Sequence, residues 1–227
     1  MGESLPKQYL KLNGITVLEH TLGLILREPK INQAVVCLGE NDDHWQILNV
    51  ADERLQTTLG GATRAASVLN GILSFADQAD DQDWLLVHDA ARPCLSAQRL
   101  TYFLQQIDGD EVGGILALAS NDTVKQAFFV EQLREEAKEG TSRIEKTLNR
   151  DLIWYAQTPQ MFRYGLLKNA LQVALDKKLD ITDEASAIEQ AGYQAKLIRG
   201  EAGNIKITNP EDLWLAEAIL ARSQNSL

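Results

Sequence analysis

The chain has 227 residues, of which 44% are hydrophobic and 24% charged. This composition is typical of a globular protein with a sizeable core, in one domain or two. The net charge of −10 argues against nucleic acid as a partner. No apolar run reaches the roughly 18 residues of a membrane-spanning helix, so we expect no membrane contact. Cys37 and Cys94 lack metal-site spacing, and we expect both to be reduced, as in a cytoplasmic protein.

The first third of the chain alternates helical and strand-like patterns. Residues 15–26 have helical spacing of apolar residues, whereas 34–39 (AVVCLG) predict a buried strand and 47–50 a second, shorter one. A Gly-containing loop at 57–63 leads into helical periodicity at 64–75. Because the first N–H groups of a helix are unpaired, this loop is either an anion- or base-binding site or a plain turn with a cap.

The stretch 84–96, WLLVHDAARPCLS, is the strongest candidate for a functional site. Four apolar residues run into His88, Asp89 and Arg92, as in a buried parallel strand whose carboxyl end opens into a site. The Asp89 carboxylate suits Mg²⁺ or a substrate hydroxyl, and the Arg92 guanidinium suits a phosphate. The alternative is a buried Asp–Arg pair that pins a loop, and the spacing alone does not decide between the two.

Beyond this stretch, residues 97–106 predict a helix and 112–119 another buried strand. The alternation of strands with helices predicts an α/β fold, with a mostly parallel sheet and right-handed crossovers. Residues 121–156 break this rhythm and contain a charged stretch at 131–140. Loops of this length are usually functional or disordered, so we expect a functional excursion here.

The last third of the chain again predicts helices and strands. Residues 163–175 predict an amphipathic helix, and Thr182 precedes a helix at 184–191. The acidic sequence after Thr182 resembles a metal site, but we interpret Thr182 as an N-cap followed by dipole-stabilising acids. Residues 204–208 (NIKIT) predict a short strand, in which Lys206 either faces solvent or lines a pocket.

Together, six motifs resemble those of one family, the 2-C-methyl-D-erythritol 4-phosphate cytidylyltransferases of non-mevalonate isoprenoid biosynthesis. They occur in the family's order and cover nearly the whole chain. The motifs are PKQYL at 6–10, GGATRAASV at 60–68, VHDAARP at 87–93, TPQMFR at 158–163, TDEASAIE at 182–189 and NIKITNPEDL at 204–213. The resemblance implies a single nucleotidyltransferase domain over 1–227. Its fold would be Rossmann-like α/β, with a mostly parallel sheet flanked by helices and a protruding β-arm at 121–157 that forms a homodimer.

The resemblance also implies an activity and the residues that perform it. The cytidylyl group of CTP would pass, with Mg²⁺ as cofactor, to 2-C-methyl-D-erythritol 4-phosphate, giving 4-diphosphocytidyl-2-C-methyl-D-erythritol and pyrophosphate. The residues implied for catalysis are Lys7, Asp89 and Arg92, with Asp89 also holding the metal. Arg163, Lys206 and Thr147 would position the polyol phosphate, some of them across the dimer. Gly61, Ala62 and Ser67 would bind the nucleotide. In some members the arginine stands one residue later, where this chain has Tyr164.

The sequence departs from the family's pattern at its start. There a strand and a Pro-Ala-Ala-Gly-x-Gly-x-Arg-Met loop come before the PKQYL motif, and Met1 aligns with the last residue of that loop. We therefore expect either an N-terminal truncation or a start placed too late, with unpaired sheet edges that favour aggregation. Two alternatives stay open: a ribitol 5-phosphate cytidylyltransferase, and a catalytically impaired homologue that acts as a binding or dimerisation module.

Overall fold

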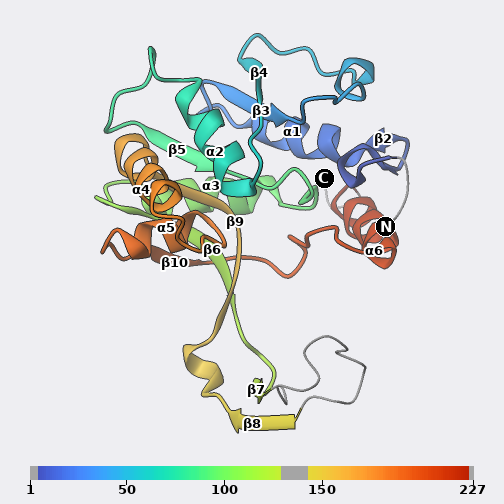
Figure 1. Ribbon diagram of the computed structural model, residues 1–227. Coiled ribbons are helices and arrows are strands. Elements are labelled where there is room, and N and C mark those ends of the chain that lie inside the picture. Colours follow the sequence, from blue (N-terminus) through green and yellow to red (C-terminus); the bar gives the residue numbers. More distant parts are fainter. Residues whose placement is uncertain (1–4, 129–142, 225–227) are drawn as a thin grey trace.

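A four-stranded sheet in the order β10–β6–β9–β5 lies at the centre of the protein (Figure 1). The computed structural model describes residues 5–128 and 143–224, and the charged stretch 131–140 lies outside them. The strands of the sheet are β5 (Trp84–Val87), β6 (Gly113–Ala119), β9 (Trp154–Arg163) and β10 (Lys196–Arg199). Strand β6 pairs parallel with β10, whereas β5 and β6 both pair antiparallel with β9. Three of the four strands run in the same direction, but the reversed strand β9 lies between β6 and β5, so two of the three pairings are antiparallel rather than parallel as predicted.

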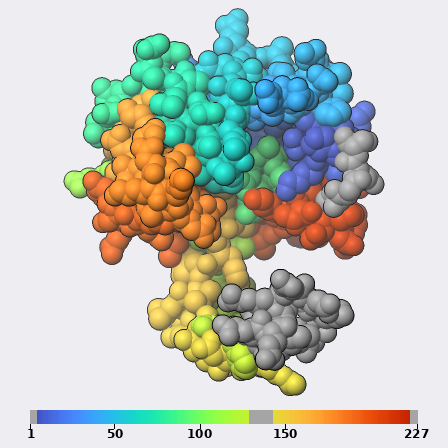
Figure 2. Space-filling view, viewed as in Figure 1, coloured from blue at the N-terminus to red at the C-terminus, as the bar shows by residue number. Residues whose placement is uncertain are grey.

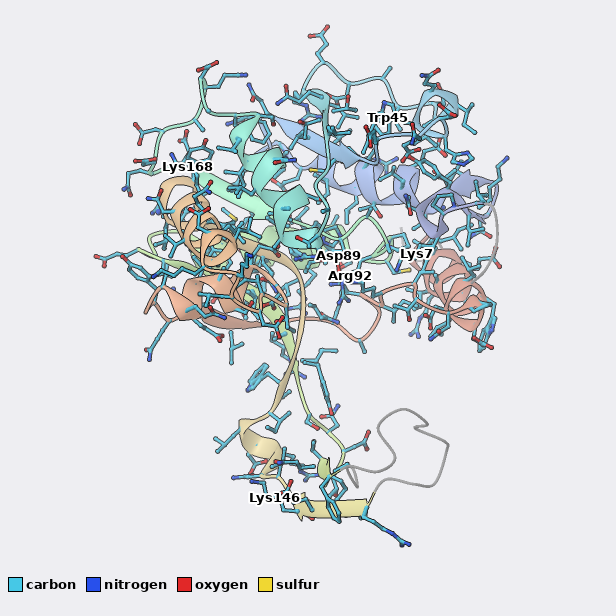
Figure 3. The ribbon with its side chains drawn as sticks, in the orientation of Figure 1. Lys7, Trp45, Asp89, Arg92, Lys146 and Lys168 are labelled. Carbon is cyan, nitrogen blue, oxygen red and sulfur yellow. The ribbon has the colours of Figure 1, made fainter. Side chains whose placement is uncertain are left out.

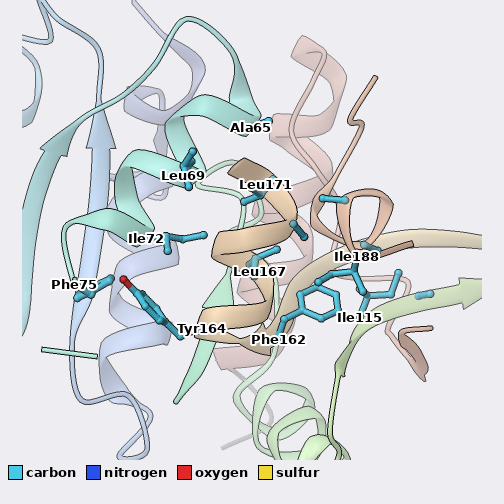
Figure 4. Packing of buried hydrophobic residues seen from close by; sticks show 14 residues of the cluster. Ala65, Leu69, Ile72, Phe75, Ile115, Phe162, Tyr164, Leu167, Leu171 and Ile188 are labelled. Atoms are coloured by element: carbon cyan, nitrogen blue, oxygen red, sulfur yellow. The ribbon is translucent and has the colours of Figure 1, made fainter. Parts of the chain in front are cut away.

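Helices cover both faces of this sheet, which confirms the predicted α/β class. They are α1 (Val17–Arg27), α2 (Arg64–Leu73), α3 (Ala97–Ile107), α4 (Tyr164–Asp176) and α5 (Glu184–Gln190). A sixth helix, α6 (Pro210–Gln224), packs in a separate apolar cluster with Leu12 and Val17. Successive residues of a strand point to opposite faces. Thus Ile115 and Phe162 pack under α2, α4 and α5 (Figure 4), whereas Leu116 and Met161 pack against α1 and α3.

Two further strands, β3 (Ala34–Leu38) and β4 (Leu55–Leu59), form a separate parallel pair. Val35 of β3 and Val87 of β5 pack against the same apolar cluster, to which α2 contributes, so both sheets share one core. Among the described residues, β3 pairs only with β4 and β5 only with β9. Both strands are half-buried rather than buried, contrary to the prediction for 34–39 and 84–87, because each has one open edge.

An antiparallel arm of β7 (Lys125–Phe128) and β8 (Arg143–Thr147) projects from the body (Figures 1 and 2). The short helix η4 (Arg150–Leu152) and the start of β9 lead back from the arm to the sheet. Several large apolar side chains in this region are exposed: Phe128, Ile144 (63%), Leu152 (77%), Trp154 and Tyr155. Unpartnered apolar surface of this kind is typical of an interaction site.

Four local predictions were wrong. The loop expected at 57–63 is shorter, because residues 57–59 belong to strand β4. Residues 47–50 form no strand, because the chain turns through η2 (Trp45–Ile47) with Ile47 exposed. Residues 204–208 also form no strand, since Ile207 donates its N–H to the carbonyl of Ala91, in a turn, and not to a strand. The N-cap of α5 is Asp183 and not Thr182, because the Asp183 carboxylate accepts the N–H of Ser186.

Candidate functional site

Asp89 lies two residues beyond the end of β5 and contacts three cationic side chains, of which Figure 3 labels Arg92. Lys206 Nζ lies 2.9 Å from Asp89 Oδ2, Arg64 Nη2 lies 3.2 Å from Oδ1, and Arg92 Nε lies 3.5 Å from Oδ2. These cations come from the first turn of α2, the turn after β5 and the segment before α6. The predicted Asp89–Arg92 pair therefore exists, but it belongs to a larger cluster and is not an isolated loop pin.

The charges around Asp89 keep its carboxylate ionised. Burial by itself raises the pKa of Asp89, but the hydrogen bond from Lys206 and the charges of Arg64, Lys206 and Arg92 outweigh burial and lower the pKa to about 2. Asp89 and Glu184, which pairs with Arg64, are two carboxylates against three cations, so positive charge remains for an anionic ligand. This is the electrostatic arrangement that a phosphate-binding site requires.

Lys7, in the short helix η1 (Lys7–Tyr9), belongs to the same cluster and lies beside Asp89 and Arg92 in Figure 3. Burial and the positive charge of Lys206 lower the pKa of Lys7, while Asp89 and Asp212 act in the opposite direction. Lys7 is therefore within electrostatic reach of both Lys206 and Asp89. The structure thus brings together Lys7, Asp89, Arg92 and Lys206, four of the residues singled out in the sequence.

Arg64 is held by a buried carboxylate that the sequence did not single out. Its Nη1 and Nη2 lie 2.6 and 2.9 Å from the two carboxylate oxygens of Glu184, a bidentate ion pair between α2 and α5. Glu184 is 0% exposed, and burial raises its pKa. Gln160 of β9 fixes this end of α5, because its amide bonds the side chain of Asp183 and the N–H of Ala185. The sheet therefore positions Glu184, and Glu184 directs Arg64 toward Asp89.

The predicted nucleotide loop borders a pocket of about 370 Å³ at the ends of β3 and β4. Ser67 organises this loop, since its hydroxyl accepts the N–H of Gly61 at 2.9 Å and also bonds the carbonyl of Thr63. A Cβ at Gly61 would lie 2.5 Å from the Cβ of Ala66, so only glycine fits there. Gly61, Ala62 and Ser67 all line the pocket, and Arg64, the first residue of the helix that follows this loop, pairs with Asp89.

Comparisons with known proteins identify the family. The family model for 2-C-methyl-D-erythritol 4-phosphate cytidylyltransferase matches residues 1–222. The chain belongs to this family. It is 46% identical to the enzyme of that name from Aliivibrio fischeri, covering 96% of this chain and 87% of the relative. It is also 48% identical to the one from Pseudomonas aeruginosa, covering 92% and 85%.

Solved structures of family members have the same fold. A crystal structure of 4-diphosphocytidyl-2C-methyl-D-erythritol synthase matches with a TM-score of 0.81 and 37% identity, covering 94% of both chains. The cytidylyltransferase from Francisella tularensis matches with a TM-score of 0.80 and 35% identity, covering 95% of this chain and 93% of that one. The Rossmann-like α/β fold expected from the sequence is therefore that of the family.

Within this chain Arg163 lies away from the cluster, and its predicted role in positioning the polyol phosphate stays a prediction. Arg163 pairs with Trp84 at the amino end of β5, whereas Asp89 follows the opposite end. Its guanidinium stacks on the Trp84 ring at 3.7 Å and donates to the carbonyls of Gln82 and Asp110. These contacts hold the loops of Gln82 and Asp110 at the far edge of the sheet. They occupy the guanidinium that, by the family resemblance, would bind the polyol phosphate.

Thr147 also lies away from the cluster, on β8 of the arm, where Lys125 Nζ donates to its hydroxyl at 2.6 Å. Its neighbour Lys146 marks this position in Figure 3, well below Asp89. The predicted role of Thr147 was in the site of a partner subunit, and that role stays a prediction.

Sequence reasoning missed Glu184 as a site residue because local signals explain it completely. It occupies the first position of α5, where an acid stabilises the helix dipole, and the spacing gives no sign of Arg64 on another helix. Thr158 was quoted within TPQMFR but was assigned no role. In the structure it is buried and its hydroxyl accepts the N–H of Asp89.

Proposed function

We propose that this protein transfers the cytidylyl group of CTP to 2-C-methyl-D-erythritol 4-phosphate, releasing pyrophosphate. The observation that carries this proposal is the cationic cluster around Asp89, which Arg64 joins to the pocket at Gly61–Ser67. Membership of the cytidylyltransferase family supports this substrate pair over ribitol 5-phosphate and over a module without activity.

The reaction requires that two anions meet. A phosphate oxygen of the polyol phosphate attacks the α-phosphorus of CTP in line, a P–O bond forms, and the bond to the β-phosphate oxygen breaks. No protein nucleophile is needed, so the protein contributes positioning and positive charge. Lys7 would stabilise the charge that develops at the α-phosphate, whereas Arg92 and Lys206 would hold the attacking phosphate. Asp89 pairs with both Arg92 and Lys206 and so orients their side chains.

The donor set at Asp89 fits a Mg²⁺ ion shared with the substrate. Mg²⁺ prefers one or two carboxylates plus phosphate oxygens and waters. Among the described residues, no group of three potential metal-ligating side chains forms a self-sufficient site. Asp89 would therefore hold the ion together with the triphosphate. When bound, Mg²⁺ neutralises the triphosphate and orients it.

We further propose that the protein works as a cytoplasmic homodimer. The exposed apolar side chains of the arm, Ile144, Leu152 and Tyr155 among them, support a partner surface formed by a second copy. Both cysteines are free thiols, which fits a reducing compartment. No described helix combines the length and apolar character needed to cross a bilayer.

The decisive assay is pyrophosphate release from CTP and Mg²⁺ with either methylerythritol phosphate or ribitol 5-phosphate. We would run it on this chain and on a form extended at its N-terminus by the family's strand and glycine loop. Activity with methylerythritol phosphate in either form supports the proposal. Turnover of ribitol 5-phosphate alone, or no turnover in both forms, overturns it.

Two matched lysine variants make the assay specific to the site. Lys206→Met removes the cation 2.9 Å from Asp89 and should lower the rate about 100- to 1000-fold, as the loss of one well-placed charge-stabilising donor commonly does. Lys168→Met removes a lysine of α4 that pairs with Asp81 and lies far from Asp89 in Figure 3, and it should retain the rate. Equal losses in both variants would contradict the assignment.

A further inference from the structure

Thr158 lies at the point where β5 ends and the turn of Asp89 begins. The ladder between β5 and β9 ends at Val87 and Gln160, so the next two positions bring Asp89 opposite Thr158. On its other side, the pairing of β9 with β6 shifts register at the same level. Register shifts beside sites commonly redirect a side chain. Here Thr158 is 4% exposed and its hydroxyl faces the backbone of the Asp89 turn.

The hydroxyl of Thr158 is the centre of a chain of hydrogen bonds. The N–H of Asp89 donates to Thr158 Oγ1 at 3.0 Å, and Oγ1 lies 2.9 Å from His88 Nδ1. His88 Nε2 lies 3.2 Å from the carbonyl oxygen of Arg92. The N–H of Arg92 in turn donates to the carbonyl of Asp89 at 3.0 Å, which closes the circuit.

Only one arrangement of protons satisfies every group in this circuit. The carbonyl of Arg92 can only accept, so His88 must carry its proton on Nε2. In the neutral ring Nδ1 then accepts, and Thr158 donates its hydroxyl proton to it while accepting the N–H of Asp89.

Thr158 also reaches the guanidinium of Arg92 by a second route. Its carbonyl accepts the side-chain amide of Asn204 at 2.7 Å, and the carbonyl of Asn204 accepts Arg92 Nη1 at 2.7 Å. Asn204 is buried, so neither bond competes with bulk water. One residue of β9 therefore holds the backbone of Asp89 and, through Asn204, the charged end of Arg92.

We propose that Thr158 and His88 are positioning residues of the transfer reaction, which act by fixing the Asp89–Arg92 turn through this directed hydrogen-bond circuit. The kinetic part of this proposal rests on the proposed function, whereas the proton arrangement does not. Neither residue touches substrate in this scheme. Each acts through the carboxylate of Asp89 and the guanidinium of Arg92, whose separation sets where the attacking phosphate lies.

The kinetic test compares Thr158→Val, which keeps the shape but loses the hydroxyl, with Thr158→Ser, which keeps the hydroxyl. Thr158→Val should lower kcat about 10- to 100-fold, because a displacement on the order of 1 Å can cost about 100-fold. KM for CTP should change less than kcat, since the pocket at Gly61 and Ser67 lies outside the circuit. Thr158→Ser should restore kcat. Thr101→Val, on the exposed face of α3, is the matched control and should match the parent protein.

A second measurement tests the circuit without any activity. In protein labelled with ¹⁵N-histidine, His88 should show a protonated Nε2 and an unprotonated, hydrogen-bonded Nδ1, and Thr158→Val should shift the Nδ1 resonance. The signal is assigned with His88→Gln. A proton on Nδ1 in the parent protein, or an unchanged kcat in Thr158→Val, would overturn the proposal. If the parent protein lacks activity while the expected tautomer is present, the proposed function fails and the circuit stands.

Discussion

The ion pair between Arg64 and Glu184 allows a quantitative test of what holds α2 to α5. We consider Arg64→Met, which keeps the length of the side chain and removes its charge. Glu184 is 0% exposed and would be left without a cation. Removal of one partner from a buried ion pair costs about 3–5 kcal/mol. Because the Arg64 side chain is 37% exposed, water can replace part of the lost interaction. We therefore expect a loss of about 2 kcal/mol.

This loss should be measurable by urea unfolding at neutral pH, followed by circular dichroism, and should lower Tm by roughly 4–8 °C. The double variant Arg64→Met/Glu184→Gln should recover part of the loss, because a neutral amide needs no cation, with a coupling free energy of about 1–2 kcal/mol. Strictly additive losses in the two single variants would refute a specific pair.

The pH dependence of this loss provides a further check on its cause. Burial raises the pKa of Glu184 in the folded protein. A raised carboxyl pKa means that the folded state binds the proton more tightly than the unfolded state, so the destabilisation grows as pH rises and fades as pH falls toward the ordinary glutamate value. The defect of Arg64→Met should therefore be largest at neutral pH and smallest near pH 4.5, the ordinary glutamate value. A defect that is constant across this range would show that lost packing, and not the unpaired carboxylate, is responsible.

Four further outcomes are expected. Ser67→Ala should raise KM for CTP about five-fold at unchanged kcat, because one hydrogen bond of about 1 kcal/mol no longer orders the loop; a changed kcat alone would contradict this. The pKa of His88 is lowered from 6.5 to about 4 in the folded protein, so the unfolded state binds this proton more tightly. The free energy of unfolding should therefore fall by about 3 kcal/mol as pH falls from 6.5 to about 4. In His88→Gln, the urea midpoint should not show this decrease with falling pH. Arg163→Leu should retain kcat but lose about 1–2 kcal/mol of stability with its stacking on Trp84, and an inactive but stable variant would restore a role in the site. The open edges of β3 and β5 should cause concentration-dependent association in light scattering, and a monodisperse protein at high concentration would show that these edges are protected.

The strand at 84–87 and the charged turn after it could be predicted because both signals are local. Apolar residues that end abruptly in His88, Asp89 and Arg92 place the site at the carboxyl end of a strand, and the structure has it there. The same pattern could not decide between a site and a loop pin. That decision depends on Lys206 and Arg64, which reach Asp89 from distant parts of the chain.

The features that the sequence could not predict are those for which one local pattern is compatible with two structures, so that tertiary contacts decide between them. An alternation of apolar residues is the same for either strand direction, so nothing in 154–163 indicated that β9 runs antiparallel to β5 and β6. Arg163 was assigned to the site by its motif, but within one chain its place on the ladder puts it at the end of β5 opposite to Asp89. Glu184 looked like a capping acid because its partner Arg64 lies 120 residues away.

Strand β9 is a single ten-residue element whose first residues lie beside the arm and whose middle carries Thr158. At about 3.3 Å per residue, Trp154 and Thr158 are separated by roughly 13 Å of extended backbone. A contact at the base of the arm and the hydrogen bond to the Asp89 turn are therefore both made by strand β9. Thermodynamic linkage makes such an effect reciprocal. If a second copy in the proposed dimer stabilises β9 through the arm, dimerisation raises the affinity for substrate, and substrate raises the affinity of dimerisation by the same factor. Dilution should then weaken dimerisation and substrate binding together.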